Sequence, residues 1–170
     1  MIIRQEVAED YAEVYNIVKI AFSFAEHCDG NEQDLVCKLR KSESFVPELS
    51  LVAVDGDNII GHIMFTTAKI CETTVLALAP LSVLPEYQKQ GVGSKLVLEG
   101  HKVAKSLGYQ LCVVLGSEIY YPKFGYTQAL KFGITAPFDV PSENFMAIAL
   151  DENFQKISGV LQYAKEFFEM

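Results

Sequence analysis

Long apolar runs and basic residues are both scarce in this sequence of 170 residues. Its richest apolar run, Val75 to Leu84, is interrupted by Pro80 and Ser82, whereas a membrane-spanning helix needs about 18 or more uninterrupted apolar residues. Lysine and arginine number 14 against 22 aspartates and glutamates, so the net charge is −8. Proteins that bind nucleic acid neutralise phosphates with clustered basic residues. The composition therefore argues against both a membrane span and a nucleic-acid partner.

Cysteine is sparse and unpatterned. The spacing of the four cysteines matches neither a CxxC motif nor a zinc site; they are Cys28, Cys37, Cys71 and Cys112. His27 and His101 also lack the paired spacing that zinc requires, so we expect no metal. Residues 1–6 reach an acidic side chain at once and lack the layout of a signal peptide. These features predict a reducing, cytoplasmic location.

The overall composition favours one folded domain. Half of the residues are hydrophobic and 21% are charged, which is far from the composition of disordered chains. A domain typically takes about 150 residues, and no repeat, low-complexity tract or Pro/Gly/Ser-rich linker interrupts the sequence. We expect a single domain over residues 1–170.

The first half of the chain predicts one strand, two helices and a hairpin. Residues 2–4 fit a short strand, and apolar residues at helical spacing predict a helix from Asp10 to Phe22, with Glu9 and Asp10 at its start. A polar stretch, residues 26–32, separates it from a second helix that carries Leu35, Val36 and Leu39. Strands over residues 49–54 and 59–67 follow, and the Asp55-Gly56 pair between them is a strong hairpin signal.

The second half predicts a mixed sheet. Val75 to Leu84 is β-rich, and Pro80 inside it marks a bulge or an edge because proline cannot donate to a sheet ladder. A helix is predicted over residues 95–107, with its apolar side at Leu96, Val97, Val103, Ala104 and Leu107 and Gly108 as its stop. Residues 111–115 fit a parallel strand, 119–124 a short helix and 145–150 a strand. Residues 132–135 are a candidate strand, and 159–163 fit either a strand or a helix. The element order predicts a layered α/β domain.

The segment from Leu81 to Ser94 carries the clearest chemical signal, because it runs from a strand through a glycine loop into a helix. Free N–H groups and the macrodipole at a helix start favour an anionic phosphate. Gly91 and Gly93 allow close approach of a phosphate to the backbone, and Lys89 and Lys95 add positive charge. The residues form no P-loop and supply only two of the three Rossmann glycines. On spacing alone, a simple tight turn explains the glycines equally well.

The residues around this loop resemble the Gcn5-related N-acetyltransferase (GNAT) family. Leu81 to Pro85 matches the family strand Leu-x-Val-x-Pro, and Gln88 to Gly93 matches the signature Gln/Arg-x-x-Gly-x-Gly/Ala. A second family element, an aromatic-rich short helix, appears as residues 120–126, Tyr-Tyr-Pro-Lys-Phe-Gly-Tyr. Residues 79–88 are similar to a bacterial group of predicted N-acetyltransferases that shares the Tyr-Tyr-x-x-Phe-Gly element, except that Ser117-Glu118 stands where that group often has Asp. The resemblance implies a three-layer α-β-α fold with a mixed, mostly antiparallel sheet of about six to seven strands that splays at its centre.

The resemblance also implies a site for acetyl-CoA. Backbone N–H groups from Gln90 to Gly93, helped by the Ser94 hydroxyl, would hold the pyrophosphate, and the main chain of residues 81–83, released by Pro80, would pair with the pantetheine arm and polarise the thioester carbonyl. An ordinary edge proline is the alternative for Pro80. The implied cofactor-binding residues are Leu81, Ser82, Val83, Gln88, Lys89, Gln90, Gly91, Val92, Gly93 and Ser94.

The reaction implied by the family is direct attack of an amine on the thioester. Tyr121 occupies the position of the family tyrosine that protonates the departing thiolate. The alternative is a tyrosine that packs the short helix, which is the role we expect for Tyr120 and Tyr126. No base is named, because a solvated acid or a satisfied histidine explains each candidate at least as well. The candidates are Glu26, His27, Asp29, Glu32, His62, Glu72 and Glu118.

We therefore predict an acetyl-CoA-dependent N-acetyltransferase that acts on a primary amine of a small molecule or peptide. The alternative is a non-catalytic acyl-CoA-binding or interaction module. Charge is uneven along the chain: basic residues Lys89, Lys95, Lys102 and Lys105 gather in and after the glycine loop, whereas 26–34 and 139–152 are acidic. This distribution predicts an anionic cofactor and a cationic amine. Family members often form dimers, so a homodimer is a further expectation.

Overall fold

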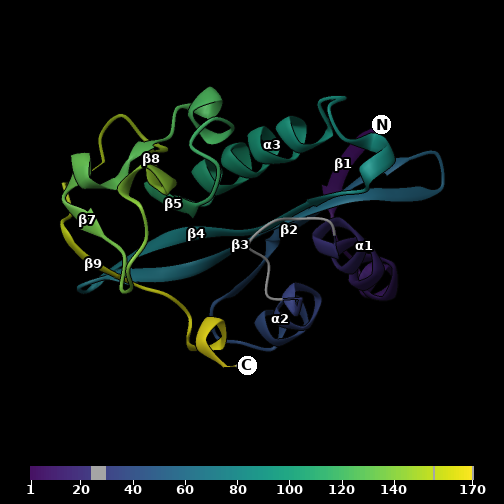
Figure 1. Ribbon diagram of the computed structural model, residues 1–170, viewed down its shortest axis with the longest axis horizontal. Helices are drawn as coiled ribbons and strands as arrows, with labels where there is room; N and C mark the ends of the chain where they lie inside the picture. The colour runs from purple at the N-terminus through teal and green to yellow at the C-terminus, as the bar shows by residue number, and fades with distance from the viewer. Residues whose placement is uncertain (24–29, 155, 170) are drawn as a thin grey trace.

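Helices cover both faces of a central sheet, with α3 on one face and α1 and α2 on the other (Figure 1). The structure is a computed structural model that describes residues 1–23, 30–154 and 156–169. The helices are α1 (Tyr11–Ser23), α2 (Glu32–Arg40) and α3 (Val92–Ser106). The strands are β1 (Ile2–Gln5), β2 (Phe45–Asp55), β3 (Asn58–Ile70), β4 (Thr73–Val83), β5 (Leu111–Leu115), β6 (Thr127–Gln128), β7 (Ile134–Thr135), β8 (Phe145–Ala149) and β9 (Gly159–Gln162). Short 3-10 helices span Ala8–Asp10, Pro85–Tyr87, Tyr121–Phe124, Ala129–Phe132, Ser142–Asn144 and Lys165–Phe168.

Within the described residues, the sheet follows the order β1-β2-β3-β4-β5-β8-β6. Strand β9 pairs with the far end of β3, and β7 pairs with β9. The pairs β4–β5 and β7–β9 are parallel, and the other pairs are antiparallel. The predicted three-layer α/β fold with a mixed, mostly antiparallel sheet is therefore confirmed. Seven strands make the continuous path, while β7 and β9 lie off it.

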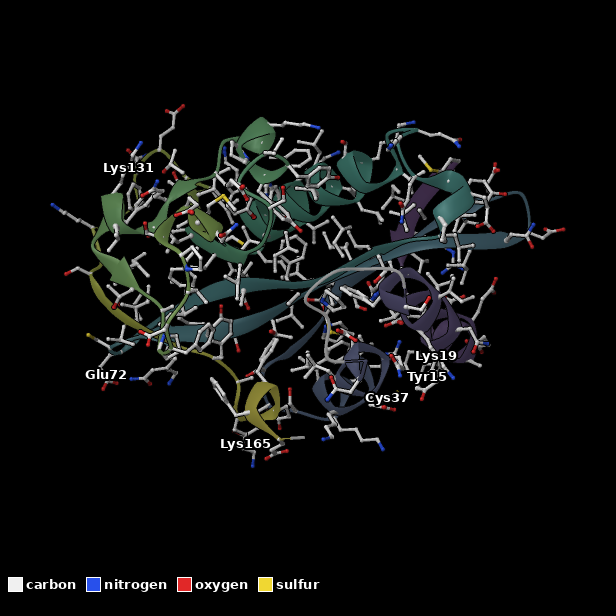
Figure 2. All side chains as sticks on the ribbon, in the orientation of Figure 1. Tyr15, Lys19, Cys37, Glu72, Lys131 and Lys165 are labelled. Carbon is white, nitrogen blue, oxygen red and sulfur yellow. The ribbon has the colours of Figure 1, made fainter. Side chains whose placement is uncertain are left out.

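Alternation of side chains along the central strands builds a core on each face. Ile63 and Phe65 of β3 pack in the cluster under α3, whereas Met64 between them packs with α1 and α2. Successive side chains of a strand point to opposite faces, so one strand serves two cores. Figure 2 shows Tyr15 of α1 next to Cys37 of α2, where the Tyr15 hydroxyl donates to Asp34 at 3.0 Å. The two N-terminal helices thus form one layer.

The hairpin between β2 and β3 turns where the sequence predicted it. Asp55 pairs with Asn58, which leaves Gly56 and Asp57 as a two-residue loop. Gly56 has φ +63°, and a positive φ at the first loop position suits the twist of the flanking strands. Both strands are longer than predicted, because β2 starts at Phe45 and β3 continues to Ile70.

Strand β4 leaves its parallel neighbour halfway along its length. Only Leu76 to Leu78 pair with β5, while the pairing of β4 with β3 continues to Val83. Leu78 pairs with Phe65 and Leu81 pairs with Ile63, so β4 has one more residue than β3 between these two pairs. The predicted bulge at Pro80 is therefore confirmed, and the peptide before this proline is cis. We call Ala79–Val83 the open edge of β4, because no described strand pairs with its β5 side.

Several element boundaries differ from the predictions. Helix α3 begins at Val92 and not at Lys95, because Gly91, with φ +85°, already turns the chain into the helix. Leu107 lies past the last helical residue and is exposed, so its assignment to the apolar side was wrong. Residues 159–162 form a strand, and β6 was not predicted, since two residues carry too little pattern. Most of the polar stretch 26–32 lies outside the described residues.

No helix in the described part of the chain combines the length and the apolar character that a membrane crossing requires.

Candidate active site

The open edge of β4 presents main-chain groups that β3 does not use. The Leu84 N–H donates to Ile60 O of β3 at 2.9 Å. Hydrogen-bonding direction alternates along a strand, so the main-chain groups of Leu81 and Val83 point to the opposite side, where β5 has ended. In agreement, Val83 O accepts from the Gln88 side-chain amide at 3.1 Å and not from β3. The open edge can therefore pair with an extended ligand.

The glycine loop leads directly from this edge to the start of α3. The Lys95 N–H donates to Gly91 O at 3.1 Å and makes the first intrahelical bond. The N–H groups of Val92, Gly93 and Ser94 precede that bond and have no acceptor within the helix. Lys89 has φ +63° and Gly91 φ +85°, so the loop folds tightly before the helix. This arrangement is suited to bind an anion.

The two glycines of the loop serve different purposes. A Cβ at Gly91 would meet nothing within 4 Å, so glycine is favoured there by its positive φ. A Cβ at Gly93 would lie 2.5 Å from the Tyr120 hydroxyl oxygen. The close partner of Gly93 is therefore a tyrosine from the second motif, which the sequence pattern did not reveal.

Tyr120 ties the second motif to the loop. Burial raises the pKa of its hydroxyl, and the Ser94 hydroxyl opposes that shift as a hydrogen-bond donor. The Tyr120 ring also lies edge-on to the Tyr121 ring, with centroids 5.2 Å apart. Tyr120 thus contacts the start of α3 with its hydroxyl and Tyr121 with its ring, a larger role than the packing that we expected of it.

Tyr121 lies beside the end of β5. A Cβ at Gly116 would lie 2.5 Å from the Tyr121 ring, so glycine is needed there for the ring to pack. The ring also lies edge-on to Tyr126, with centroids 5.7 Å apart. No described residue hydrogen-bonds to the Tyr121 hydroxyl, and burial raises its pKa well above the ordinary value. Its hydroxyl is therefore protonated and uncommitted, in that none of the described residues pairs with it.

Ser117 and Asn144 hold this segment in place, and the sequence analysis missed both roles. The Ser117 hydroxyl accepts from the N–H groups of Ile119 and Tyr120 at 3.2 and 3.1 Å. The Asn144 side chain donates to Gly116 O at 3.0 Å and to Glu118 at 2.8 Å. A serine hydroxyl that accepts from N–H groups two and three residues later is a known turn motif. Ser117 therefore caps this turn.

The buried side chains of Cys112 and Tyr126 and the half-buried His101 form a hydrogen-bonded group next to Tyr121. The Tyr126 hydroxyl donates to Cys112 Sγ at 3.3 Å and lies 2.8 Å from His101 Nε2. Burial raises the pKa of Cys112 to about 12, so its thiol stays protonated and packs as a small hydrophobic group. His27 and Cys28 lie outside the described residues. Elsewhere, no three side chains of metal-ligand type gather.

Charged residues are less concentrated at the loop than the sequence suggested. Lys89 and Lys95 flank it, but Lys102 and Lys105 lie about 15–20 Å along α3, at a rise of about 1.5 Å per residue. Glu72 sits in the β3–β4 turn at the far end of β4 (Figure 2) and cannot act at the open edge. Glu118 is held by Asn144. Glu26, His27 and Asp29 lie outside the described residues.

Comparison with known proteins agrees with this geometry. The family model for the acetyltransferase (GNAT) domain matches residues 47–128. An uncharacterized N-acetyltransferase of Escherichia coli K12, YjhQ, is 36% identical over 140 residues, which cover 79% of this chain and 75% of that protein. The structure of E. coli YhbS in complex with CoA has a TM-score of 0.90 at 25% identity, covering 99% of this chain and 92% of that one. A Brucella melitensis GNAT acetyltransferase in complex with acetyl-CoA has a TM-score of 0.82 at 29% identity, covering 98% and 97%.

The chain therefore belongs to the GNAT family of acetyltransferases. The prediction of an acetyl-CoA-dependent N-acetyltransferase is confirmed at the level of the activity.

Proposed function

We propose that this enzyme transfers the acetyl group of acetyl-CoA directly to a primary amine of a small molecule or peptide, within a single domain of residues 1–170. The observation that carries the proposal is the continuity of the site. The open edge of β4 leads into the free N–H groups of α3, and Tyr120 joins that loop to the segment that carries Tyr121. An edge for the pantetheine arm, N–H groups for the phosphates and a proton donor for the thiolate thus occur together, as acyl transfer from a CoA thioester requires.

The glycine loop binds the pyrophosphate in this proposal. N–H groups of Gln90, Gly91, Val92 and Gly93 point toward the phosphates, and the partial positive charge of the helix start favours their charge. The Ser94 hydroxyl and the Lys89 ammonium add polar contacts, while Gln88 fixes the strand end through Val83 O. The binding energy comes mainly from the backbone, so it depends on the conformation at Gly91.

The open edge of β4 holds the pantetheine arm and the thioester. Main-chain groups of Leu81 and Val83 pair with the amides of the arm as a neighbouring strand would, next to the buried Ser82. An N–H at this edge donates to the thioester oxygen, whose negative charge grows as the amine adds to the carbon. The edge is preorganised because β3 fixes its other side.

Tyr121 completes the reaction as a general acid. The neutral amine nitrogen attacks the carbonyl carbon, and the tetrahedral adduct collapses as the carbon–sulfur bond breaks and the nitrogen releases one proton to solvent. The departing thiolate takes the hydroxyl proton of Tyr121, which solvent later restores. The uncommitted hydroxyl of Tyr121 supports this role over Tyr120, whose hydroxyl lies against Gly93 and Ser94.

The acceptor side of the proposal is a cationic amine, and the assembly is a homodimer. The net charge of −8 and the acidic segment 139–152 support a positively charged acceptor. Sedimentation of the full chain tests the dimer, and a single species of 18.9 kDa would contradict it.

Thiol release from acetyl-CoA tests the main proposal. The full-length enzyme is assayed with a panel that contains a polyamine, an arylalkylamine, free lysine and a short peptide, and mass spectrometry checks the acetylated nitrogen. We expect N-acetylation of at least one member. Tight binding of CoA without turnover on any member would support the non-catalytic module instead.

A further inference from the structure

A buried chain of polar side chains ends beside the open edge of β4. Arg40 of α2 pairs with Glu6, the Ser50 hydroxyl of β2 donates to Glu6 at 2.7 Å, and His62 Nε2 of β3 lies 3.0 Å from Ser50 Oγ. The side chains of Arg40, Glu6 and His62 are 7%, 1% and 0% exposed. Burying such a chain costs free energy unless each member has a hydrogen-bond partner. An end of the chain without a partner therefore indicates a place where a further group binds.

Proton counting along this chain fixes the tautomer of His62. Glu6 is paired with Arg40 and only accepts, so the single hydroxyl proton of Ser50 points to Glu6. His62 Nε2 must then carry a proton and donate it to Ser50 Oγ. Burial and the charge of Arg40 lower the pKa of His62 to about 3, so the ring is neutral. Its Nδ1 is consequently a bare acceptor.

That acceptor is buried and has no partner in the described part of the chain, and the same holds for the hydroxyl of Ser82 on the opposite strand. His62 Nδ1 and Ser82 Oγ are both inaccessible and both lack a hydrogen bond among the described residues. His62 pairs directly with Ser82 across β3 and β4, and opposite residues of a sheet have Cβ atoms about 4.5–5.5 Å apart. Unsatisfied buried polar atoms are rare and often belong to a water or ligand site.

The pair lies on the face from which an acceptor would arrive. The side chains of Leu81 and Val83 pack toward the core under α3, so Ser82 between them points to the other face. The glycine loop would hold the phosphates at the start of α3, and the pantetheine arm would run along the open edge itself. In this arrangement the acceptor amine approaches the carbonyl carbon from the face that carries Ser82 and His62.

We propose that His62 and Ser82 hold one water molecule that positions the acceptor amine, an inference that rests on the proposed function. The water donates one hydrogen bond to His62 Nδ1 and accepts one from the Ser82 hydroxyl. With its second lone pair it accepts a hydrogen bond from an N–H of the amine. The amine nitrogen thereby keeps its own lone pair directed at the thioester carbon. Arg40, Glu6 and Ser50 act as positioning residues, because they hold the tautomer that accepts.

The first test measures the tautomer and needs no amine. In the full-length protein labelled with nitrogen-15 histidine, the imidazole resonances at neutral pH should show His62 with a proton on Nε2 and a bare Nδ1. The His62→Asn variant assigns the signals. A proton on Nδ1, or a doubly protonated ring, would overturn the proposal.

The second test uses the amine of the panel that is acetylated fastest and two variants of His62. Each variant places a polar group near only one of the two ring nitrogens. His62→Asn places an amide oxygen near the position of Nδ1, whereas His62→Gln reaches toward Ser50 and leaves no acceptor at Nδ1. We expect His62→Gln and Ser82→Ala to raise the KM for the amine about tenfold, the effect of one lost hydrogen bond, with the KM for acetyl-CoA unchanged. His62→Asn should retain most of the activity.

A control variant removes a similar buried hydroxyl away from the edge. Thr66 Oγ1 of β3 is also unpartnered and buried, but Thr66 lies opposite Ala77, where β4 and β5 are still paired. Thr66→Val should leave both KM values unchanged.

Equal losses in His62→Asn and His62→Gln, or equal changes in both KM values for Ser82→Ala, would indicate a structural role and overturn the proposal. If the wild type acetylates no amine of the panel, the proposed function fails, while the tautomer measurement still decides the state of His62.

Discussion

Tyr120 and Tyr121 are neighbours in the chain but present their hydroxyls to different groups. Tyr121→Phe removes only the uncommitted hydroxyl, so we expect kcat to fall by about 10²–10⁴, the usual contribution of a general acid. The KM for acetyl-CoA should stay unchanged, because the ring still packs on Gly116. Steady-state kinetics with varied acetyl-CoA measure both constants. Equal losses in kcat and in CoA affinity would assign Tyr121 to packing.

Gly93 and Tyr120 form a pair that a double-mutant cycle can isolate. Gly93→Ala brings a Cβ to 2.5 Å from the Tyr120 hydroxyl oxygen, and such overpacking costs about 1–3 kcal/mol. We expect weaker CoA binding by calorimetry. In the Tyr120→Phe background the nearest remaining ring atom is 3.7 Å away, so the same substitution should have little effect. An equal loss in both backgrounds would rule out this contact as the reason for glycine.

At the scale of elements, the turn after β5 places Tyr121, and Ser117 caps it. Ser117→Ala leaves the N–H groups of Ile119 and Tyr120 without their acceptor, and the loss of such a cap costs about 1 kcal/mol. We expect a lower melting temperature and a lower kcat. Ser117→Asp keeps an acceptor and should behave like the wild type in both measurements. A loss as large in Ser117→Asp would contradict the capping role.

At the scale of the whole molecule, two histidines make stability depend on pH, His62, which is buried, and His101, which is half-buried. Burial lowers the pKa of His62 to about 3 and of His101 to about 4. The unfolded chain binds protons near pH 6.5 and the folded chain does not. The free energy of unfolding therefore falls with pH below about 6.5, by about 1.4 kcal/mol per histidine between pH 7.5 and 5.5.

Urea denaturation at the two pH values measures this dependence. His101→Gln removes one of the two groups and should reduce the change by about half. Equal stability of the wild type at pH 7.5 and pH 5.5 would show that the histidines are not held neutral by the fold.

The net charge of −8 leads to a prediction about the acceptor. If the acidic segment 139–152 attracts a cation, kcat/KM should fall with added salt, because about 0.1 M salt screens charges beyond about 10 Å. A diamine and the monoamine of equal chain length provide a matched pair. The diamine should lose more activity in salt. An identical salt dependence for both would remove the electrostatic argument.

The sequence by itself determined the class of fold and singled out residues 81–94 as the proposed cofactor segment. Both are local properties: alternation and helical spacing follow from backbone geometry, and residues 81–94 carry strand, loop and helix start in one contiguous segment. Tyr121 was singled out by the resemblance to GNAT sequences, which could be recognised because its motif is continuous.

The tertiary structure decided which residues meet. Position 93 must be glycine because Tyr120, which lies 27 positions later in the chain, contacts it. His62 faces Ser82 only because β3 and β4 pair in one register. The chain from Arg40 to His62 joins α2, β2 and β3 through the residue after β1. Such contacts depend on register and packing between distant elements, and a one-residue slip would turn each side chain to the other face. No local pattern in the sequence encodes that choice.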